Sequence, residues 1–432
     1  MRRGIMIRVY LTLCIATLSA VTSHADPVPV DVVAVDGGYT LLRNGRPYLV
    51  KGAGLGDIDV TTVAARGGNS VRTWGIEHAQ TTLDAAHRHG LTVSLGLPVA
   101  AERFGFDYDD PESIAEQRQN VLDAVASYKD HPALLAWIIG NELDMRFTNP
   151  RVYNEVNELS RLIHDLDPNH PTTTTISAIE EDVVELVRER APDLDFISLQ
   201  AYGALALMPK AIRYLRAGPF MITEWGPLGH WEVGKTRWGA PIEQDSTEKG
   251  RHYLTSYKTF IEPFLGPGLG SYVFLWGQKQ ERTHTWFSLF TEDGESTAAV
   301  DVMQFVWTGR APANQAPALE PLRLARRPAT DSVRLAAGRR YTAKVEAMDP
   351  DGDTLVFRWH VKPESTETVV GGDPEARITD VDGVFDGDAT GAEVELTAPG
   401  SPGAYRLYVM VYDGQSHAAH ANIPFRVFGK KR

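Results

Sequence analysis

Cysteine is almost absent from this chain. Its one cysteine among 432 residues is Cys14, which lies in an N-terminal segment of the kind that is removed on export. A chain without other thiols forms no disulfide and has no cysteine nucleophile, so packing must stabilise it. With 43% hydrophobic residues, 38 glycines and 26 prolines, the length suits a well-packed soluble protein of more than one domain.

Long hydrophobic runs are scarce as well. The N-terminus carries three arginines, an apolar run from Val9 to Val21 and small residues up to Ala25. This order predicts a secretion signal peptide over residues 1–25. A retained anchor is the alternative, although the run is short for a bilayer span. We expect an exported protein, periplasmic or extracellular, without a membrane span.

Positive charge is in deficit. The formal net charge is −13 at pH 7, and an acidic surface argues against nucleic acid or an anionic membrane as a partner. The 13 histidines show no His-Glu-x-x-His or comparable spacing, which argues against a catalytic metal. No cofactor is expected. A Gly-x-Ser-x-Gly elbow, which would support an esterase or protease, is missing too.

What the chain does contain is a regular alternation of strand and helix. A hairpin with an Asn44-Gly45 turn comes first, and helical spacing follows in stretches such as Ser113–Tyr128 and Pro150–Leu166. Strands alternating with helices predict an α/β fold, a (β/α)₈ TIM barrel. A doubly wound open sheet is the alternative, because periodicity does not show closure. The candidate strands are Tyr48–Gly54, Asn69–Trp74, Thr92–Leu97, Leu134–Gly140, Thr172–Ser177, Phe196–Gln200, Phe220–Thr223 and Gly270–Leu275.

The composition changes after residue 309. Proline, alanine and small polar residues predict a linker over residues 312–318, between a catalytic barrel domain over residues 26–311 and a small all-β domain over residues 319–432. Short alternating strands with Gly, Asp and Pro turns predict a β-sandwich there, which could contact glycan or a cell surface. Its candidate strands are Arg340–Ala347, Leu355–Val361, Glu393–Thr397 and Tyr405–Tyr412.

An acidic turn, Asp349 to Asp353, precedes one of these strands. It lacks the later glutamate of an EF-hand loop. It resembles the Asp-rich turn of cadherin-like or PKD-like sandwich modules, which leaves calcium binding open beside the plainer interpretation of an Asx-rich turn.

Two further segments each lead an apolar run into a glutamate, Trp137–Glu142 and Phe220–Glu224. Parallel barrels keep their catalytic groups at the C-terminal ends of buried strands. Acetal cleavage needs a proton for the leaving group and a negative partner for an oxocarbenium-like centre, which two carboxyl groups supply. Repulsion between them would keep one protonated. The pair predicts a glycosidase, although each glutamate alone could equally be an ion-pair partner at the barrel mouth.

The order of Asn141-Glu142 after the fourth strand and Glu224 ending the seventh resembles the clan of retaining β-glycosidases with (β/α)₈ barrels. The likeness is closest to the catalytic domain of glycoside hydrolase family two and covers residues 35–310. It implies that Glu142 is the acid/base and Glu224 the nucleophile. Two features depart from that family: no β-sandwich precedes the barrel, and the loop Trp225–Glu248 matches no family pattern. The sugar and linkage are therefore left open.

The resemblance implies further site residues. Asn141 would hydrogen-bond the sugar hydroxyl next to the anomeric carbon, Arg72 would orient the nucleophile, and Tyr202 would donate a hydrogen bond to it. The clan often has histidine near the position of Gln200, so this part of the network is in question. A plain salt bridge is the alternative role for Arg72.

Aromatic residues complete the expected site. By the same resemblance Trp276 would form the floor of the sugar site, and Trp74 and Trp225 would line it, because a flat indole covers the apolar face of a pyranose. Core packing is the alternative for each.

Together these features predict an exported, retaining glycoside hydrolase that acts on a β-linked glycan by double displacement without a cofactor. Two alternatives stay open. One is a transglycosylase on β-glucan-type glycans, because the same residues would serve either acceptor. The other is a non-catalytic glycan-binding or adhesion protein that uses the barrel as a scaffold.

Overall fold

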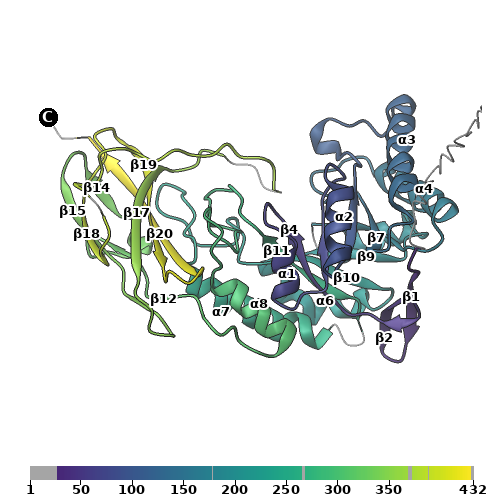
Figure 1. Cartoon of the computed structure of the whole chain (residues 1–432). Coiled ribbons are helices and arrows are strands. Elements are labelled where there is room, and N and C mark those ends of the chain that lie inside the picture. The colour runs from purple at the N-terminus through teal and green to yellow at the C-terminus, as the bar shows by residue number, and fades with distance from the viewer. Residues whose placement is uncertain (1–26, 178, 265–267, 368–371, 388, 430–432) are drawn as a thin grey trace, which may run out of the picture.

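The computed structural model describes residues 27–177, 179–264, 268–367, 372–387 and 389–429. The predicted signal peptide and Cys14 lie outside these residues. Figure 1 shows two parts side by side, a barrel surrounded by helices and a smaller all-β part that carries the C-terminus. Within the described ranges no helix is both long enough and apolar enough to cross a membrane.

Eight parallel strands close into a barrel in the order β10-β11-β4-β5-β6-β7-β8-β9. All eight segments predicted as strands form it, and closure excludes the open doubly wound sheet. The predicted TIM barrel followed by an all-β part is confirmed. The barrel strands are β4 (Val50–Leu55), β5 (Ser70–Arg72), β6 (Thr92–Leu97), β7 (Leu134–Ile139), β8 (Thr172–Ile176), β9 (Phe196–Gln200), β10 (Phe220–Trp225) and β11 (Gly270–Trp276).

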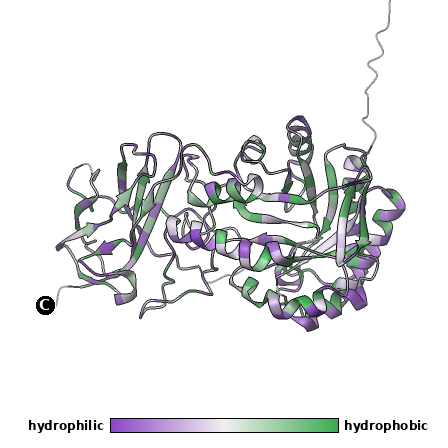
Figure 2. Cartoon of the chain, turned by 90° about the horizontal axis from the view of Figure 1, so that it is seen from below, coloured by the Kyte–Doolittle hydropathy of each residue, from purple (hydrophilic) through white to green (hydrophobic). Residues whose placement is uncertain are grey.

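Helices cover the outside of the barrel. They are α1 (Thr61–Ala65), α2 (Ala79–Arg88), α3 (Pro111–Tyr128), α4 (Arg151–Leu166), α5 (Glu181–Arg190), α6 (Met208–Leu215), α7 (Ser246–Ser256) and α8 (Ala298–Thr308), with short turns η1 (Glu102–Phe104), η2 (Gly203–Leu207), η3 (Tyr257–Ile261) and η4 (Glu262–Phe264). A further short turn, η5 (Ala329–Asp331), belongs to the C-terminal part. Side chains cap the first turns of two of the helices: Asp110 caps α3, and Asp245 and Glu248 form a capping box at α7. Figure 2 shows hydrophobic colouring on the strands and hydrophilic colouring on the outer helix faces.

The predicted N-terminal hairpin covers the end of the barrel where the strands begin. It consists of β1 (Val30–Val35), β2 (Gly38–Arg43) and β3 (Arg46–Pro47), and its Asn44-Gly45 turn has the positive φ values that such turns need. Leu41 is buried against residues at the strand starts, including Tyr272. The opposite end of the barrel is therefore the end that stays available for a site.

The C-terminal part consists mainly of a four-stranded sheet, β14-β20-β19-β17, and a three-stranded sheet, β13-β15-β18, with a hydrophobic core of their own. The predicted strand Arg340–Ala347 is interrupted and forms two strands, and the last strand was not predicted. The strands are β12 (Ala318–Leu319), β13 (Arg323–Leu324), β14 (Arg334–Ala336), β15 (Arg340–Lys344), β16 (Ala347–Met348), β17 (Val356–Pro363), β18 (Glu393–Thr397), β19 (Gly403–Tyr412) and β20 (Ala418–Phe428).

Polar contacts fasten this β-sandwich to the barrel. In the predicted linker, the Ala316 N–H donates to Asp301 at 2.7 Å. Within the interface, the buried Glu243 accepts from Lys249 of α7 at 2.6 Å and from Asn422 of β20 at 2.7 Å. The two parts therefore share an interface with buried hydrogen bonds, while the exact domain boundaries stay a prediction.

Candidate active site

A cavity of about 610 Å³ opens at the C-terminal ends of the barrel strands, and both predicted catalytic glutamates, Glu142 and Glu224, line it. Its volume is typical of a small-molecule site. Asn141, Tyr202 and Trp74 also line it. The structure thus brings together five of the eight residues predicted for the site, and Arg72 lies directly behind them.

Arg72 and Tyr202 hold the Glu224 carboxylate from two sides. Arg72 ends β5 and is fully buried. Its Nη1 atom donates to the Thr223 carbonyl oxygen at 2.9 Å and to Glu224 Oε2 at 3.3 Å. The Tyr202 hydroxyl donates to Glu224 Oε1 at 3.3 Å. Each carboxylate oxygen therefore has its own donor, which fixes the plane of the group.

Asn141 is oriented by three donors that converge on its Oδ1 atom. They come from Arg72 Nη2 at 2.6 Å, Gln200 Nε2 at 2.8 Å and Thr175 Oγ1 at 3.2 Å. Because Oδ1 accepts all three, the Asn141 amide NH₂ group is turned away from these partners and remains a donor at the pocket. Gln200, whose part in this network the sequence left in question, is thus one of the residues that hold Asn141.

Glu142 lies in an unusual backbone conformation. Its φ of 48° is in the left-handed region, which glutamate rarely adopts and which is often found at functional sites. Its N–H donates to Thr175 Oγ1 at 2.9 Å. Burial, followed by the charges of Glu224 and Asp144, raises the pKa of Glu142 to about 8. This carboxyl group therefore holds its proton at neutral pH.

The surroundings of the two glutamates differ. Burial raises the pKa of Glu224 also, but the charges of Arg72 and Lys279 and the hydrogen bond from Tyr202 act in the opposite direction. The effects of Arg72 and Arg103 on Glu142 are smaller than those of its acidic neighbours. When one proton is shared between the two carboxyl groups, Glu142 is the better holder and Glu224 the better anion.

Aromatic rings form the walls of the pocket. Trp74 meets Phe274 edge to face at a ring distance of 5.6 Å, and Tyr202 meets Phe287 at 5.3 Å. All four, together with Trp231, line the cavity. Such surfaces suit the apolar C–H faces of a sugar ring.

Trp276 and Trp225 are not at the pocket, contrary to the prediction. Trp276 is fully buried, donates from Nε1 to Thr62 Oγ1 at 2.8 Å and packs on Trp307 of α8. Trp225 packs on Tyr253 of α7. Both indoles therefore fill the layer between strands and helices, and on β11 it is Phe274 that faces the cavity.

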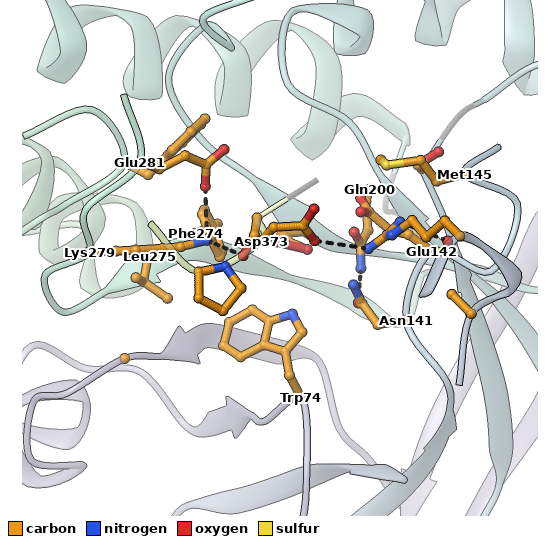
Figure 3. A pocket seen from close by; sticks show the side chains of 18 of the residues that line it. Trp74, Asn141, Glu142, Met145, Gln200, Phe274, Leu275, Lys279, Glu281 and Asp373 are labelled. Carbon is orange, nitrogen blue, oxygen red and sulfur yellow. Dashed lines mark hydrogen bonds and ion pairs between the residues drawn. The ribbon is translucent and has the colours of Figure 1, made fainter. Parts of the chain in front are cut away.

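Several charged residues at the pocket were not predicted. Lys279 and Glu281 follow β11 and form an ion pair at 2.9 Å. Arg103 follows β6 and pairs at 4.0 Å with Asp373 of the β-sandwich, which is labelled in Figure 3. The first three lie just past strand ends, a position that is itself a signal in a TIM barrel. Nothing in the sequence places Asp373 there.

The acidic turn of the β-sandwich brings three carboxylates close together. One oxygen from each of Asp349, Asp353 and Asp413 lies within 4.8 Å of the others. Asp349 Oδ1 also accepts from the N–H groups of Asp351 and Asp353, at 2.9 and 3.0 Å, which is the geometry of an Asx turn. Calcium binding at this turn stays an open alternative beside the Asx turn.

Comparisons with known proteins place the barrel among similar folds. No family model matches the chain. It is 30% identical over 115 residues to mannan endo-1,4-beta-mannosidase F of Aspergillus clavatus, covering 23% of this chain and 26% of that protein. The β-D-glucuronidase of Dictyoglomus thermophilum has a similar structure, with a TM-score of 0.50 and 16% identity over 66% of this chain and 54% of that one. The chain thus spans only part of each relative, and the structural likeness shows the barrel fold.

Proposed function

We propose that this protein is a glycoside hydrolase that cleaves β-glycosidic bonds of an oligo- or polysaccharide with retention of configuration. The observation that carries the proposal is a pair of buried glutamates in one pocket. Glu142 is protonated at neutral pH and can donate a proton, and hydrogen bonds from Arg72 and Tyr202 stabilise the Glu224 carboxylate. The two similar proteins, an endo-β-mannosidase and a β-glucuronidase, both have names that describe enzymes acting on β-linked sugars.

The proposed reaction has two steps. Glu224 attacks the anomeric carbon while Glu142 gives its proton to the leaving oxygen, so that a covalent glycosyl-enzyme forms. Water then gives a proton to Glu142 and attacks the same carbon, which releases the sugar and frees Glu224. Arg72 and Tyr202 hold Glu224 in the attacking position, and the Asn141 amide donates to the neighbouring sugar hydroxyl.

We also propose that the enzyme is exported, periplasmic or extracellular, on the strength of its basic, apolar and small-residue N-terminal order. Its partner is then a carbohydrate encountered outside the cytoplasm. The proposed roles of Arg72, Asn141 and Tyr202 do not depend on this location.

Two variants test the reaction. Glu224→Gln is expected to lower kcat/KM on every β-glycan by roughly 10⁴-fold or more, the scale of losing a nucleophile. Glu142→Gln should lower kcat/KM far more on substrates with poor leaving groups than on dinitrophenyl glycosides, whose leaving group needs no proton. Glu116→Gln, at an exposed position of α3, is the matched control and should leave rates unchanged.

Proton NMR of the first product gives the stereochemistry. Retention requires the β anomer to appear before mutarotation. A first product in the α form would contradict the double displacement, and activity that survives Glu224→Gln would contradict the role of Glu224.

A further inference from the structure

One side of the pocket is built by the β-sandwich. Residues 372–375, here called the strap, belong to the connection between β17 and β18, and Gly372, Asp373 and Pro374 line the cavity with the barrel residues. In Figure 3 Asp373 lies between the Lys279–Glu281 pair on one side and Glu142 on the other. A residue from a different domain thus stands over the candidate catalytic groups.

Hydrogen bonds hold the strap to the loop after β11. Lys279 Nζ donates to the Gly372 carbonyl oxygen at 2.8 Å. The Arg282 N–H donates to Glu375 Oε2 at 3.0 Å. These contacts anchor both ends of the strap, so that Asp373 between them has a defined position rather than that of a free surface side chain.

Asp373 also reaches the opposite side of the pocket mouth. Its carboxylate pairs with Arg103, which follows β6, at 4.0 Å. The Arg103 side chain is held in turn by stacking over Phe104 and by donation to the Glu142 carbonyl oxygen at 3.3 Å. With 24% of the Asp373 side chain exposed, its carboxylate remains accessible to a molecule in the cavity.

The charged residues of the pocket lining are more acidic than basic. Because Glu142 holds its proton at neutral pH, the charged residues are the carboxylates of Glu224, Glu281 and Asp373 against the cations of Arg103 and Lys279. Both cations already have a carboxylate partner, Asp373 and Glu281 respectively. A sugar that brought its own carboxylate would meet like charge and would lose hydration without gaining a new cation. Uncharged hydroxyl groups, in contrast, are donors that a carboxylate accepts strongly.

We propose that the strap is part of the substrate site and that Asp373 is a specificity-determining residue, which accepts hydrogen bonds from an uncharged sugar and, with Glu281, discriminates against uronic acids. This inference rests on the proposed glycoside hydrolase function and names its substrate class. It gives the β-sandwich a direct part in recognition, although the sandwich carries no reacting group.

The test compares the full chain with Asp373→Asn and Asp373→Ala. The substrates are aryl β-glycosides and β-1,4-linked oligosaccharides of glucose, galactose and mannose, beside the corresponding glucuronic acid compounds. The intact chain should have its highest kcat/KM on a neutral sugar. Both variants should lower that value about tenfold, the loss of one hydrogen bond to a charged group. The lower kcat/KM should come mainly from a higher KM. The ratio of kcat/KM on the neutral sugar to kcat/KM on the glucuronide should become smaller.

The matched control is Asp386→Ala, which removes an exposed aspartate of the same β17–β18 connection that pairs with Arg340; it should change kcat/KM by less than about twofold. Thermal unfolding of each variant checks folding, and Asp373→Asn keeps the shape of the side chain if Asp373→Ala is poorly folded. An unchanged sugar preference in Asp373→Asn, or a preference of the intact chain for glucuronides, overturns this inference alone. Inactivity of the intact chain on the whole panel overturns the proposed function with it.

Discussion

Two buried glutamates in this molecule have opposite proton affinities. Glu243, between the barrel and the sandwich, is 6% exposed, and Glu142, in the pocket, is 8% exposed. Burial alone would raise the pKa of Glu243, but the charges of Lys249 and its other basic neighbours, together with the hydrogen bond from Lys249, lower it to about 2. Burial and acidic neighbours raise the pKa of Glu142 to about 8. Two equally buried glutamates thus have pKa values shifted in opposite directions, and the charges of the neighbouring residues decide the direction of the shift.

The contrast separates a structural site from a reactive one. Glu243 accepts from Lys249, Asn422, Thr283 and Thr285, at 2.6 to 2.9 Å, so its charge is compensated on all sides. Glu142 is given acidic neighbours instead, and its unfavourable ionisation is a free-energy cost in the folded state. Natural enzymes commonly tolerate such costs at active sites.

The largest expected effect comes from removing the cation of the structural site. Lys249→Met leaves the buried Glu243 charge without its ion-pair partner, and the free energy of unfolding at pH 7 should fall by about 3–5 kcal/mol. Urea denaturation measures this. The control Lys258→Met breaks the exposed pair with Glu262 and should lose less than about 0.5 kcal/mol. A loss for Lys249→Met as small as that of the control would remove the basis of the comparison.

The opposite sign is expected in the pocket. The pKa of Glu142 in the folded state, about 8, lies above its ordinary value of 4.5. Between pH 4.5 and pH 8 the carboxyl group therefore ionises in the unfolded state but stays protonated in the folded state. As a result, the free energy of unfolding falls as the pH rises through this range. Glu142→Gln, which cannot ionise, should therefore raise the free energy of unfolding at pH 7 by roughly 1–3 kcal/mol. Melting temperatures at pH 7 and pH 4.5 measure it. The gain should vanish at pH 4.5, and a gain equal at both pH values would contradict the titration.

A smaller effect concerns the rate. If Glu142 is the proton donor, kcat/KM should fall as pH rises through about 8, by about tenfold per pH unit once Glu142 is deprotonated. A profile of kcat/KM from pH 5 to pH 10 on a substrate with a poor leaving group measures this limb. Glu142→Gln should flatten it, and a limb that persists in this variant would assign the titration to another group.

The sequence predicted most of the barrel because its strands are short runs between turn signals, and some of them, such as Leu134–Ile139, are fully apolar. Glu142 and Glu224 were predictable for a related reason. A carboxylate directly after a buried apolar strand lies at the C-terminal end of that strand, where TIM barrels have their active sites. Asn141, Arg72 and Tyr202 followed from resemblance; the structure places Arg72 and Tyr202 against Glu224 and Asn141 against Arg72, and their roles stay a prediction.

For Trp276, the difference between the predicted and the observed position has a local cause. Val273 pairs with Ala53 and Trp276 with Leu55, so β11 uses three residues where β4 uses two. This extra residue changes the side of the sheet on which the following side chains lie. Phe274 therefore faces the pocket and Trp276 the helices. Simple alternation of side chains from the sequence does not reveal such a bulge.

Asp373 was beyond sequence reasoning for another reason. It lies in a polar connection without regular secondary structure, and its position over the pocket depends on the docking of one domain on another. Such a contact joins residues as far apart in sequence as Arg103 and Asp373. Neither periodicity nor a motif encodes it.

Because the strap comes from the β-sandwich, our proposal assigns the selectivity of this protein to one part of the chain and its chemistry to another. Substitutions around the strap could retune which sugars are accepted without disturbing the carboxyl pair inside the barrel. By the same reasoning, a small change in the angle between the two parts would alter the substrate preference before it affected the fold of either part.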